Sequence, residues 1–203
     1  MRSSRTGTLY REYIIDPGLE RSTLFEALAM RRPGIETVVY PGCSIHVTPS
    51  MYFRHVTYVD RSDRSAQFFT DEPGVAKVIA DRSHHSKAPH VQFIHQDFTE
   101  PLPVREASFC LPLALYTPGV ARATARYLRV GGLLVMDNHR VEAADAMRER
   151  NLNLIGSGRT GRIAVDLVSE APDTPPVETE SPQNRSGAPD YYVFERIRDH
   201  AGR

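Results

Sequence analysis

Two carboxylates that could bind a ligand stand directly after predicted β-strands. Asp60 ends a run of β-branched and aromatic residues at 56–59, and Asp97 closely follows a second run of this kind at 91–95. In parallel sheets, ligands bind beyond the carboxyl ends of the strands, near the point where the strand order reverses. The sequence therefore predicts a ligand site in the turns after Tyr40, Val59, His95 and Leu115.

The elements that must position these turns alternate along the chain. Strand-like segments lie at 37–40, 56–59, 91–95, 109–115, 133–136, 153–155 and 191–195, with a further extended piece at 163–168. Helical patterns lie at about 16–32, 48–54, 65–70, 73–82, 120–128 and 141–150. Strands separated by helices at this spacing form βαβ units. The predicted fold class is therefore α/β, with a doubly wound, mostly parallel sheet and helices on both faces.

We expect a single domain, because 203 residues fall near the usual size of one domain. A helical N-terminal segment, 1–34, is expected to pack on a core formed by 35–203. Segment 171–189 holds five prolines and almost no large apolar residue, so it is predicted to be an exposed, mobile loop.

Composition excludes several classes of function. Lys plus Arg and Asp plus Glu are both 25, which argues against a broad basic face for nucleic acid. The two cysteines, Cys43 and Cys110, are too few for a disulfide framework, and this indicates a reducing, cytoplasmic setting. The N-terminus lacks an apolar signal core, and the longest apolar stretch, 109–116, is far shorter than the ~20 residues of a membrane span. We therefore expect a soluble, cytoplasmic protein with no membrane or nucleic-acid partner.

Four stretches resemble, in order, the motif series of the class I S-adenosylmethionine-dependent methyltransferases. They are VVYPGCS at 38–44, Val59-Asp60, HQDF at 95–98 and LRVGGLLV at 128–135. The match spans about 35–198, and the closing YYVF at 191–194 is similar to the family's antiparallel last strand. The stretch Y-P-G-C-x-x-H also looks like a little-characterised branch of this superfamily. The resemblance implies a Rossmann-like fold, S-adenosylmethionine as cofactor and methyl transfer to a small molecule.

The resemblance also assigns cofactor-binding residues. Asp60 would accept hydrogen bonds from both ribose hydroxyls, and Asp97 would accept one from the adenine amino group, with Arg61 and Phe98 beside the ring. The remaining cofactor contacts would come from Tyr40, Pro41, Gly42, Cys43, Ser44 and Leu115. Two alternatives stay open: Asp60 as a turn or N-cap aspartate, and Asp97 as a solvated loop carboxylate.

The first turn departs from the family's pattern. Members usually carry an acid at the place of Tyr40 and a G-x-G-x-G run, of which only Gly42 is present here. Ser44 and His46 stand at the places of the later glycines. His46 could contact the cofactor carboxylate or act as a base, since imidazole titrates near neutrality. The alternative is a structural loop histidine.

The catalytic candidates are His46, Tyr116 and His139. Tyr116 follows the fourth strand, and His139 closes the cluster Asp137-Asn138-His139 after the fifth, for which a plain polar turn is the alternative. Methyl transfer is an in-line displacement, and much of its catalysis can come from holding the acceptor at near-attack distance. A general base is therefore optional.

Two other functions stay open. A methyltransferase-like fold whose altered first turn has lost cofactor binding would be a binding or partner module. A dinucleotide-dependent oxidoreductase would share the sheet, but its glycine fingerprint is missing after the first strand. The G-x-G-x-x-G spelling at 156–161 leads into a strand-like segment, where the fingerprint must open a helix, so it is interpreted as a hairpin turn.

No metal site is expected. His84 and His85 are adjacent in a predicted loop and belong to no metal-ligand spacing pattern, which favours solvated loop residues. The sequence leaves the acceptor, its reacting atom and the number of associated chains open.

Overall fold

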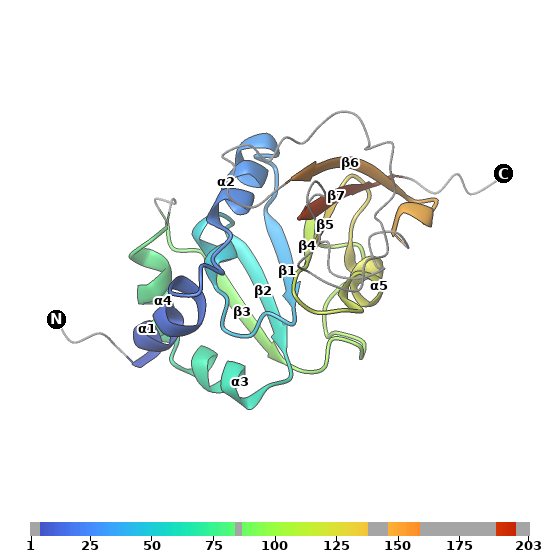
Figure 1. Ribbon diagram of the computed structural model, residues 1–203. Helices are drawn as coiled ribbons and strands as arrows, with labels where there is room; N and C mark the ends of the chain where they lie inside the picture. Colours follow the sequence, from blue (N-terminus) through green and yellow to red (C-terminus); the bar gives the residue numbers. More distant parts are fainter. Residues whose placement is uncertain (1–4, 84–86, 138–145, 159–189, 198–203) are drawn as a thin grey trace. The chain divides into compact units, whose positions relative to one another are not determined.

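A computed structural model describes residues 5–83, 87–137, 146–158 and 190–197 (Figure 1). The chain divides into two compact units, 1–102 and 103–203, and each is considered by itself.

The first unit is built on three parallel strands, β1 (Thr37–Pro41), β2 (His55–Asp60) and β3 (His90–His95), with β2 in the middle. Val38, Val39 and Tyr40 are fully buried, as is typical of a parallel strand covered on both faces. The register pairs Pro41 with Val59 and Asp60 with His95. The three carboxyl ends therefore meet at one edge.

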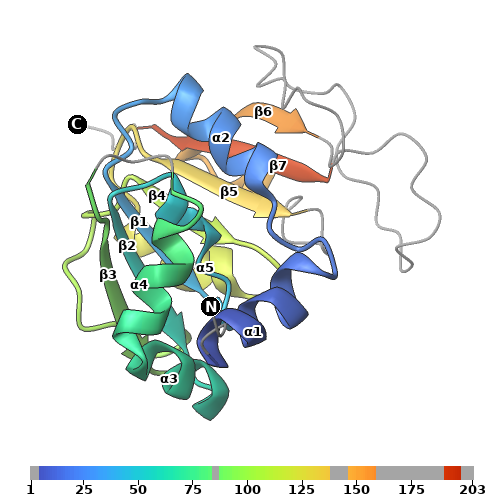
Figure 2. The same ribbon diagram turned by 90° about the vertical axis from the view of Figure 1, so that its left-hand side faces the viewer.

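Two helices of the first unit begin at residues whose short polar side chains cap them. The helical elements are α1 (Arg5–Tyr10), η1 (Arg11–Ile15), α2 (Ser22–Arg31), η2 (Thr48–Met51), α3 (Asp63–Thr70) and α4 (Glu72–Ala80). Ser62 caps α3 by accepting from the Ser65 N–H at 3.2 Å, and Asp71 caps α4 by accepting from the Gly74 N–H at 3.1 Å. Figure 2 shows α3 and α4 in front of the strands, with α1 beside them.

Two helices differ from the sequence-based expectation. The helix expected from about residue 16 begins only at Ser22, because Gly18 (φ 72°) and Arg21 (φ 53°) adopt left-handed conformations that break it. The helix expected over 48–54 is the short 3₁₀ turn η2. The Tyr58 hydroxyl holds this turn, accepting from the Ser50 N–H and donating to the Val47 carbonyl, both at 3.2 Å.

The second unit contains both parallel and antiparallel strands. Its elements are β4 (Leu111–Ala114), α5 (Val120–Thr124), η3 (Ala125–Tyr127), β5 (Leu133–Asp137), β6 (Leu152–Gly158) and β7 (Tyr191–Arg196). β4 and β5 are parallel, whereas β7 runs antiparallel to both β5 and β6. The predicted fold class, a Rossmann-like and mostly parallel sheet with an antiparallel last strand, is confirmed.

Some predicted segments cannot be compared with the structure. Segments 163–168 and 171–189 and most of the helix expected over 141–150 lie outside the described residues. Within 156–161, Gly156 and Gly158 belong to β6, where they pair with Val193 and Tyr191 of β7. These two glycines therefore lie in a strand rather than at the start of a helix.

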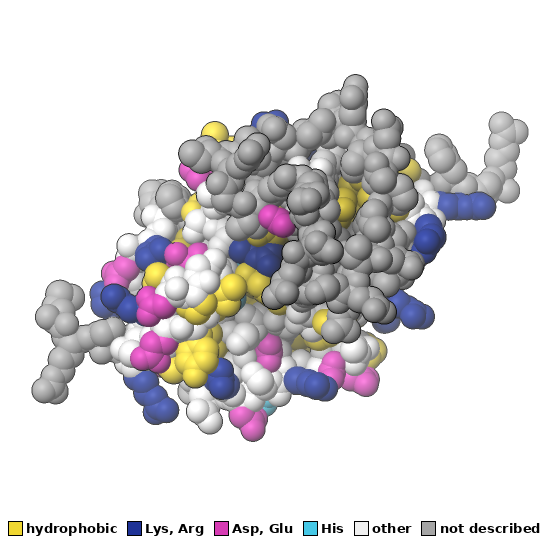
Figure 3. All heavy atoms as spheres, in the orientation of Figure 1, with side chains coloured by type: hydrophobic (Ala, Val, Ile, Leu, Met, Phe, Trp, Pro, Cys, Tyr) yellow, Lys and Arg dark blue, Asp and Glu magenta, His cyan; other side chains and the backbone are white. Residues whose placement is uncertain are grey.

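The described surface carries mixed charge. On the face in Figure 3, basic and acidic side chains alternate, with hydrophobic atoms between them. Among the described helices, none combines the length and apolar character needed to cross a bilayer.

The double glycine of the LRVGGLLV element has a packing role that can be tested. A Cβ on Gly132 would lie 2.6 Å from Leu128 Cδ1, 2.9 Å from the Arg129 carbonyl oxygen and 3.0 Å from the Cys110 carbonyl oxygen. Two of these neighbours are backbone atoms that cannot rotate away. We expect Gly132→Ala to lower the free energy of unfolding by about 1–3 kcal/mol in urea denaturation. Gly34→Ala, with open space around its Cβ, is the control. Equal stability of the two variants would contradict this packing role.

Candidate functional site

Asp60 organises the edge of the first unit where β1, β2 and β3 end. Its Oδ2 accepts from the Ser44 N–H and its Oδ1 from the Ser62 N–H, both at 2.8 Å. The carboxylate thus joins the turn after β1 to the start of α3. Because a carboxylate offers about four acceptor positions, each oxygen can accept a further hydrogen bond. Asp60 is half-buried, and Ser44 beside it is exposed.

The turn after β1 is only partly exposed to solvent. Pro41 and Cys43 are buried, whereas Gly42 is half-buried. Gly42 (φ 64°) and Ser44 (φ 50°) both adopt left-handed conformations. Burial, followed by the nearby Asp60 charge, raises the pKa of the Cys43 thiol well above its usual value, which keeps the thiol protonated. A buried, protonated thiol of this kind is a poor nucleophile.

Behind this turn lies a buried chain of polar groups formed by Tyr40, His46 and Glu20. The Tyr40 hydroxyl lies 3.0 Å from His46 Nδ1, and His46 Nε2 lies 3.1 Å from the Glu20 carbonyl oxygen. Because a carbonyl only accepts, Nε2 carries the proton and Nδ1 accepts from Tyr40. His46 is 2% exposed and has a protein partner on each nitrogen. This geometry suits a positioning role, and action as a base would first require one of these bonds to break.

The Glu20 contact was not predicted from the sequence. Glu20 lies 26 residues before His46, in the segment between η1 and α2. Its carboxylate also pairs with Arg82 at 2.6 Å. No local pattern marks either contact, because both depend on how the N-terminal segment packs.

Asp97 and its neighbours form a more exposed cluster. Asp97 Oδ2 pairs with Arg61 Nη1 at 3.0 Å, and its Oδ1 accepts from the N–H and hydroxyl of Thr99 at 3.0 and 2.8 Å. These two Thr99 donors, followed by Arg61, lower the pKa of Asp97. The Arg61 side chain is 78% exposed, so this ion pair adds little stability. Phe98 is half-buried beside it.

In the second unit, the structure joins two predicted candidates. Tyr116 adopts a left-handed conformation (φ 64°), and its N–H donates to Asp137 Oδ2 at 2.6 Å. Asp137 therefore fixes the turn that follows β4, a contact that sequence analysis missed because the two residues are 21 positions apart. Leu115 is fully buried. Asn138 and His139 lie outside the described residues.

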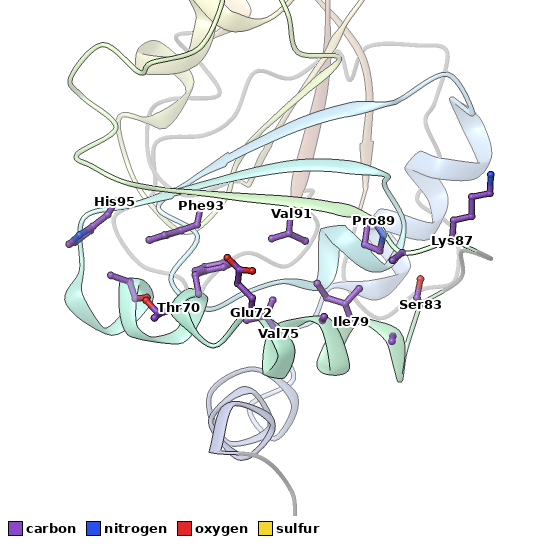
Figure 4. Close-up of a pocket in the computed structure, with 15 residues that line it drawn as sticks. Thr70, Glu72, Val75, Ile79, Ser83, Lys87, Pro89, Val91, Phe93 and His95 are labelled. Atoms are coloured by element: carbon purple, nitrogen blue, oxygen red, sulfur yellow. The ribbon is translucent and has the colours of Figure 1, made fainter.

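A groove of about 910 Å³ runs along β3 of the first unit, between that strand and α3–α4 (Figure 4). Its walls include Val75, Ile79, Val91 and Phe93, and His95 lies at one end. His95 Nε2 lies 3.1 Å from the Arg61 carbonyl oxygen, so this end of the groove adjoins the Asp60–Arg61 turn. In the described part of the chain, no three His, Cys, Asp or Glu side chains are grouped to hold a metal ion. His84 and His85 lie outside that part.

Comparison with known proteins bears on the fold. No protein-family model matches the chain, and no curated protein matches it. Among solved structures, the N-methyltransferase NodS from Bradyrhizobium japonicum WM9 superposes with a TM-score of 0.53, covering 88% of this chain and 96% of NodS at 13% identity. The fold is that of the class I methyltransferases.

A second solved structure with this fold is a branched-chain polyamine synthase mutein from Thermus thermophilus, in complex with N4-aminopropylspermidine and 5′-methylthioadenosine. It has a TM-score of 0.52, covering 87% of this chain and 56% of that enzyme at 16% identity. At such identities the likeness concerns the fold alone. The chemistry of this chain must therefore be argued from its own residues.

The buried imidazole predicts a specific pH dependence. Burial lowers the pKa of His46 from 6.5 to about 4. Between these values the unfolded chain takes up a proton that the folded chain excludes. Folding is therefore destabilised as pH falls from about 6.5 to about 4, with a slope of up to ~1.4 kcal/mol per pH unit.

We expect His46→Gln to lose this part of the pH dependence in urea denaturation at several pH values between 7 and 4. The exposed His55 offers a control, and His55→Gln should keep the slope of the unsubstituted protein. An unchanged slope in His46→Gln would show that another group is responsible.

Proposed function

We propose that this protein binds S-adenosylmethionine at the carboxyl ends of β1–β3 and transfers its methyl group to a small molecule. The observation that carries the proposal is the Asp60 carboxylate, held by the N–H groups of Ser44 and Ser62 beside a turn with left-handed residues at 42 and 44. Both oxygens keep acceptor capacity, which suits two neighbouring ribose hydroxyls. This acceptor capacity supports the proposal that Asp60 binds the adenosyl half of the cofactor.

The other residues receive roles in this proposal. Asp97 would accept from the adenine amino group, with Arg61 and Phe98 beside the ring. The turn at 40–44 would present its backbone to the rest of the cofactor. When bound, S-adenosylmethionine supplies an electrophilic methyl group. Tyr116 and His139 would orient the acceptor or take its proton, and His46 would hold Tyr40 in place.

A second candidate function is favoured by the Tyr40–His46–Glu20 chain. Its Tyr40 and His46 side chains are buried and neutral, and they stand where the family usually carries an acid and a glycine. The charged methionyl end of the cofactor would then meet neutral side chains. In this alternative, the fold serves as a binding or partner module that no longer uses the cofactor.

Calorimetric titration with S-adenosylmethionine, S-adenosylhomocysteine and 5′-methylthioadenosine separates the two functions. Binding of the first two ligands is the expected result. Binding of 5′-methylthioadenosine alone would mean that only the adenosyl half is recognised, and would favour the second candidate. No binding of any of the three would reject an adenosyl site.

Asp60→Ala should weaken S-adenosylmethionine binding by about 1.5–3 kcal/mol, roughly 10-fold to 150-fold, because a charged acceptor is lost. Asp60→Asn, which keeps one acceptor oxygen for the turn, should weaken it less. Asp63→Ala is the matched control, since the Asp63 side chain is 92% exposed at the start of α3. Thermal melts would verify folding, and unchanged affinity in both well-folded Asp60 variants would remove Asp60 from the site.

A further inference from the structure

A second cavity lies within the second unit, among α5, β5, β6, β7 and residues 146–149. Its volume is about 700 Å³, within the range of small-molecule sites. Its apolar lining consists of Ala121, Ala125, Leu128, Leu134, Ala146 and Leu152. Leu128, Leu134 and Ala146 are each less than 5% exposed, so the floor belongs to the core of this unit.

Three arginines from three segments reach the same cavity. Arg122 comes from α5, Arg148 from the stretch after residue 145, and Arg196 from the end of β7. Among the described lining residues, Glu149 is the single acid. Among the described lining residues, guanidinium groups outnumber carboxylates around an apolar floor, which favours an anion. The planar guanidinium matches a carboxylate in two-point geometry.

Arg196 is held in position before any ligand arrives. Its Nη1 donates to the carbonyl oxygens of Ala125 at 3.2 Å and Leu128 at 2.5 Å. Both acceptors lie at the end of the α5–η3 segment, which also contributes to the cavity floor. A side chain fixed in this way loses less conformational freedom on binding a ligand.

The Arg196 end of the cavity lies away from the predicted chemistry of this unit. β7 runs antiparallel to β5, so Glu195 pairs with Leu133 at the amino end of β5. Arg196 therefore lies beyond that end. Asp137 and its partner Tyr116 lie at the carboxyl end of the same strand.

We propose that this cavity is a binding site for a small apolar carboxylate, whose hydrocarbon part contacts the floor and whose carboxylate pairs with the arginines. Isothermal titration of the full chain at low ionic strength with octanoate, octan-1-ol and inorganic phosphate tests it. Octanoate should bind at least about tenfold more tightly than octan-1-ol, because charge-assisted hydrogen bonds are lost in the alcohol. Phosphate should bind weakly, since it has no apolar part.

Substitutions locate the site. Arg122→Gln and Arg148→Gln should each weaken octanoate binding, and the double variant should weaken it by about tenfold or more. Arg129→Gln is the matched control, because Arg129 is exposed and is not among the described lining residues. Arg196 is not substituted, because its side chain also donates hydrogen bonds to the carbonyl oxygens of Ala125 and Leu128. Circular dichroism melts would verify that each variant folds.

Three outcomes would overturn the proposal. They are absent octanoate binding, equal affinity for octanoate and octan-1-ol, and phosphate binding as tight as that of octanoate. Unchanged octanoate affinity in the folded double variant would also overturn it. Asp60→Ala should leave octanoate binding intact, so this site and the proposed cofactor site can fail independently.

Discussion

The two hydrogen bonds that Asp60 accepts from backbone N–H groups are the constraint on which the candidate site depends. One comes from Ser44, in the turn after β1, and the other from Ser62, which caps α3. A carboxylate can hold both because it only accepts and offers several acceptor positions. The shape of the turn and the position of a possible ligand acceptor are thus set by one side chain.

The turn held by Asp60 packs against buried side chains, where the family's pattern has its later glycines. His46 occupies the interior, with Tyr40 and the Glu20 carbonyl as partners. A buried polar group without a hydrogen-bond partner lowers the stability of the fold. These hydrogen bonds therefore hold β1, the turn after it and the N-terminal segment together. The N-terminal segment thereby becomes part of the support of the site. The two candidate functions differ in whether this neutral interior can still face a charged methionyl group.

The LRVGGLLV element, among the more specific parts of the family resemblance, is explained by packing rather than by chemistry. Gly131 has a φ of 74°, and Gly132 approaches the backbone at Cys110 and Arg129 too closely for a side chain. The double glycine allows η3 to turn into β5 beside β4. Such a motif indicates the fold strongly and says little about the reaction. This is why the function has to be argued from Asp60 and its surroundings.

The sequence by itself determined the strands, the alternation with helices and the fold class, because apolar runs and the turn residues that end them are local signals. It also placed Asp60 and Asp97 at strand ends. Only the tertiary structure decided where α2 begins and which partners His46 and Tyr116 take. The His46 and Tyr116 contacts join residues 26 and 21 positions apart. No local pattern records them, since they form only when separate elements pack together.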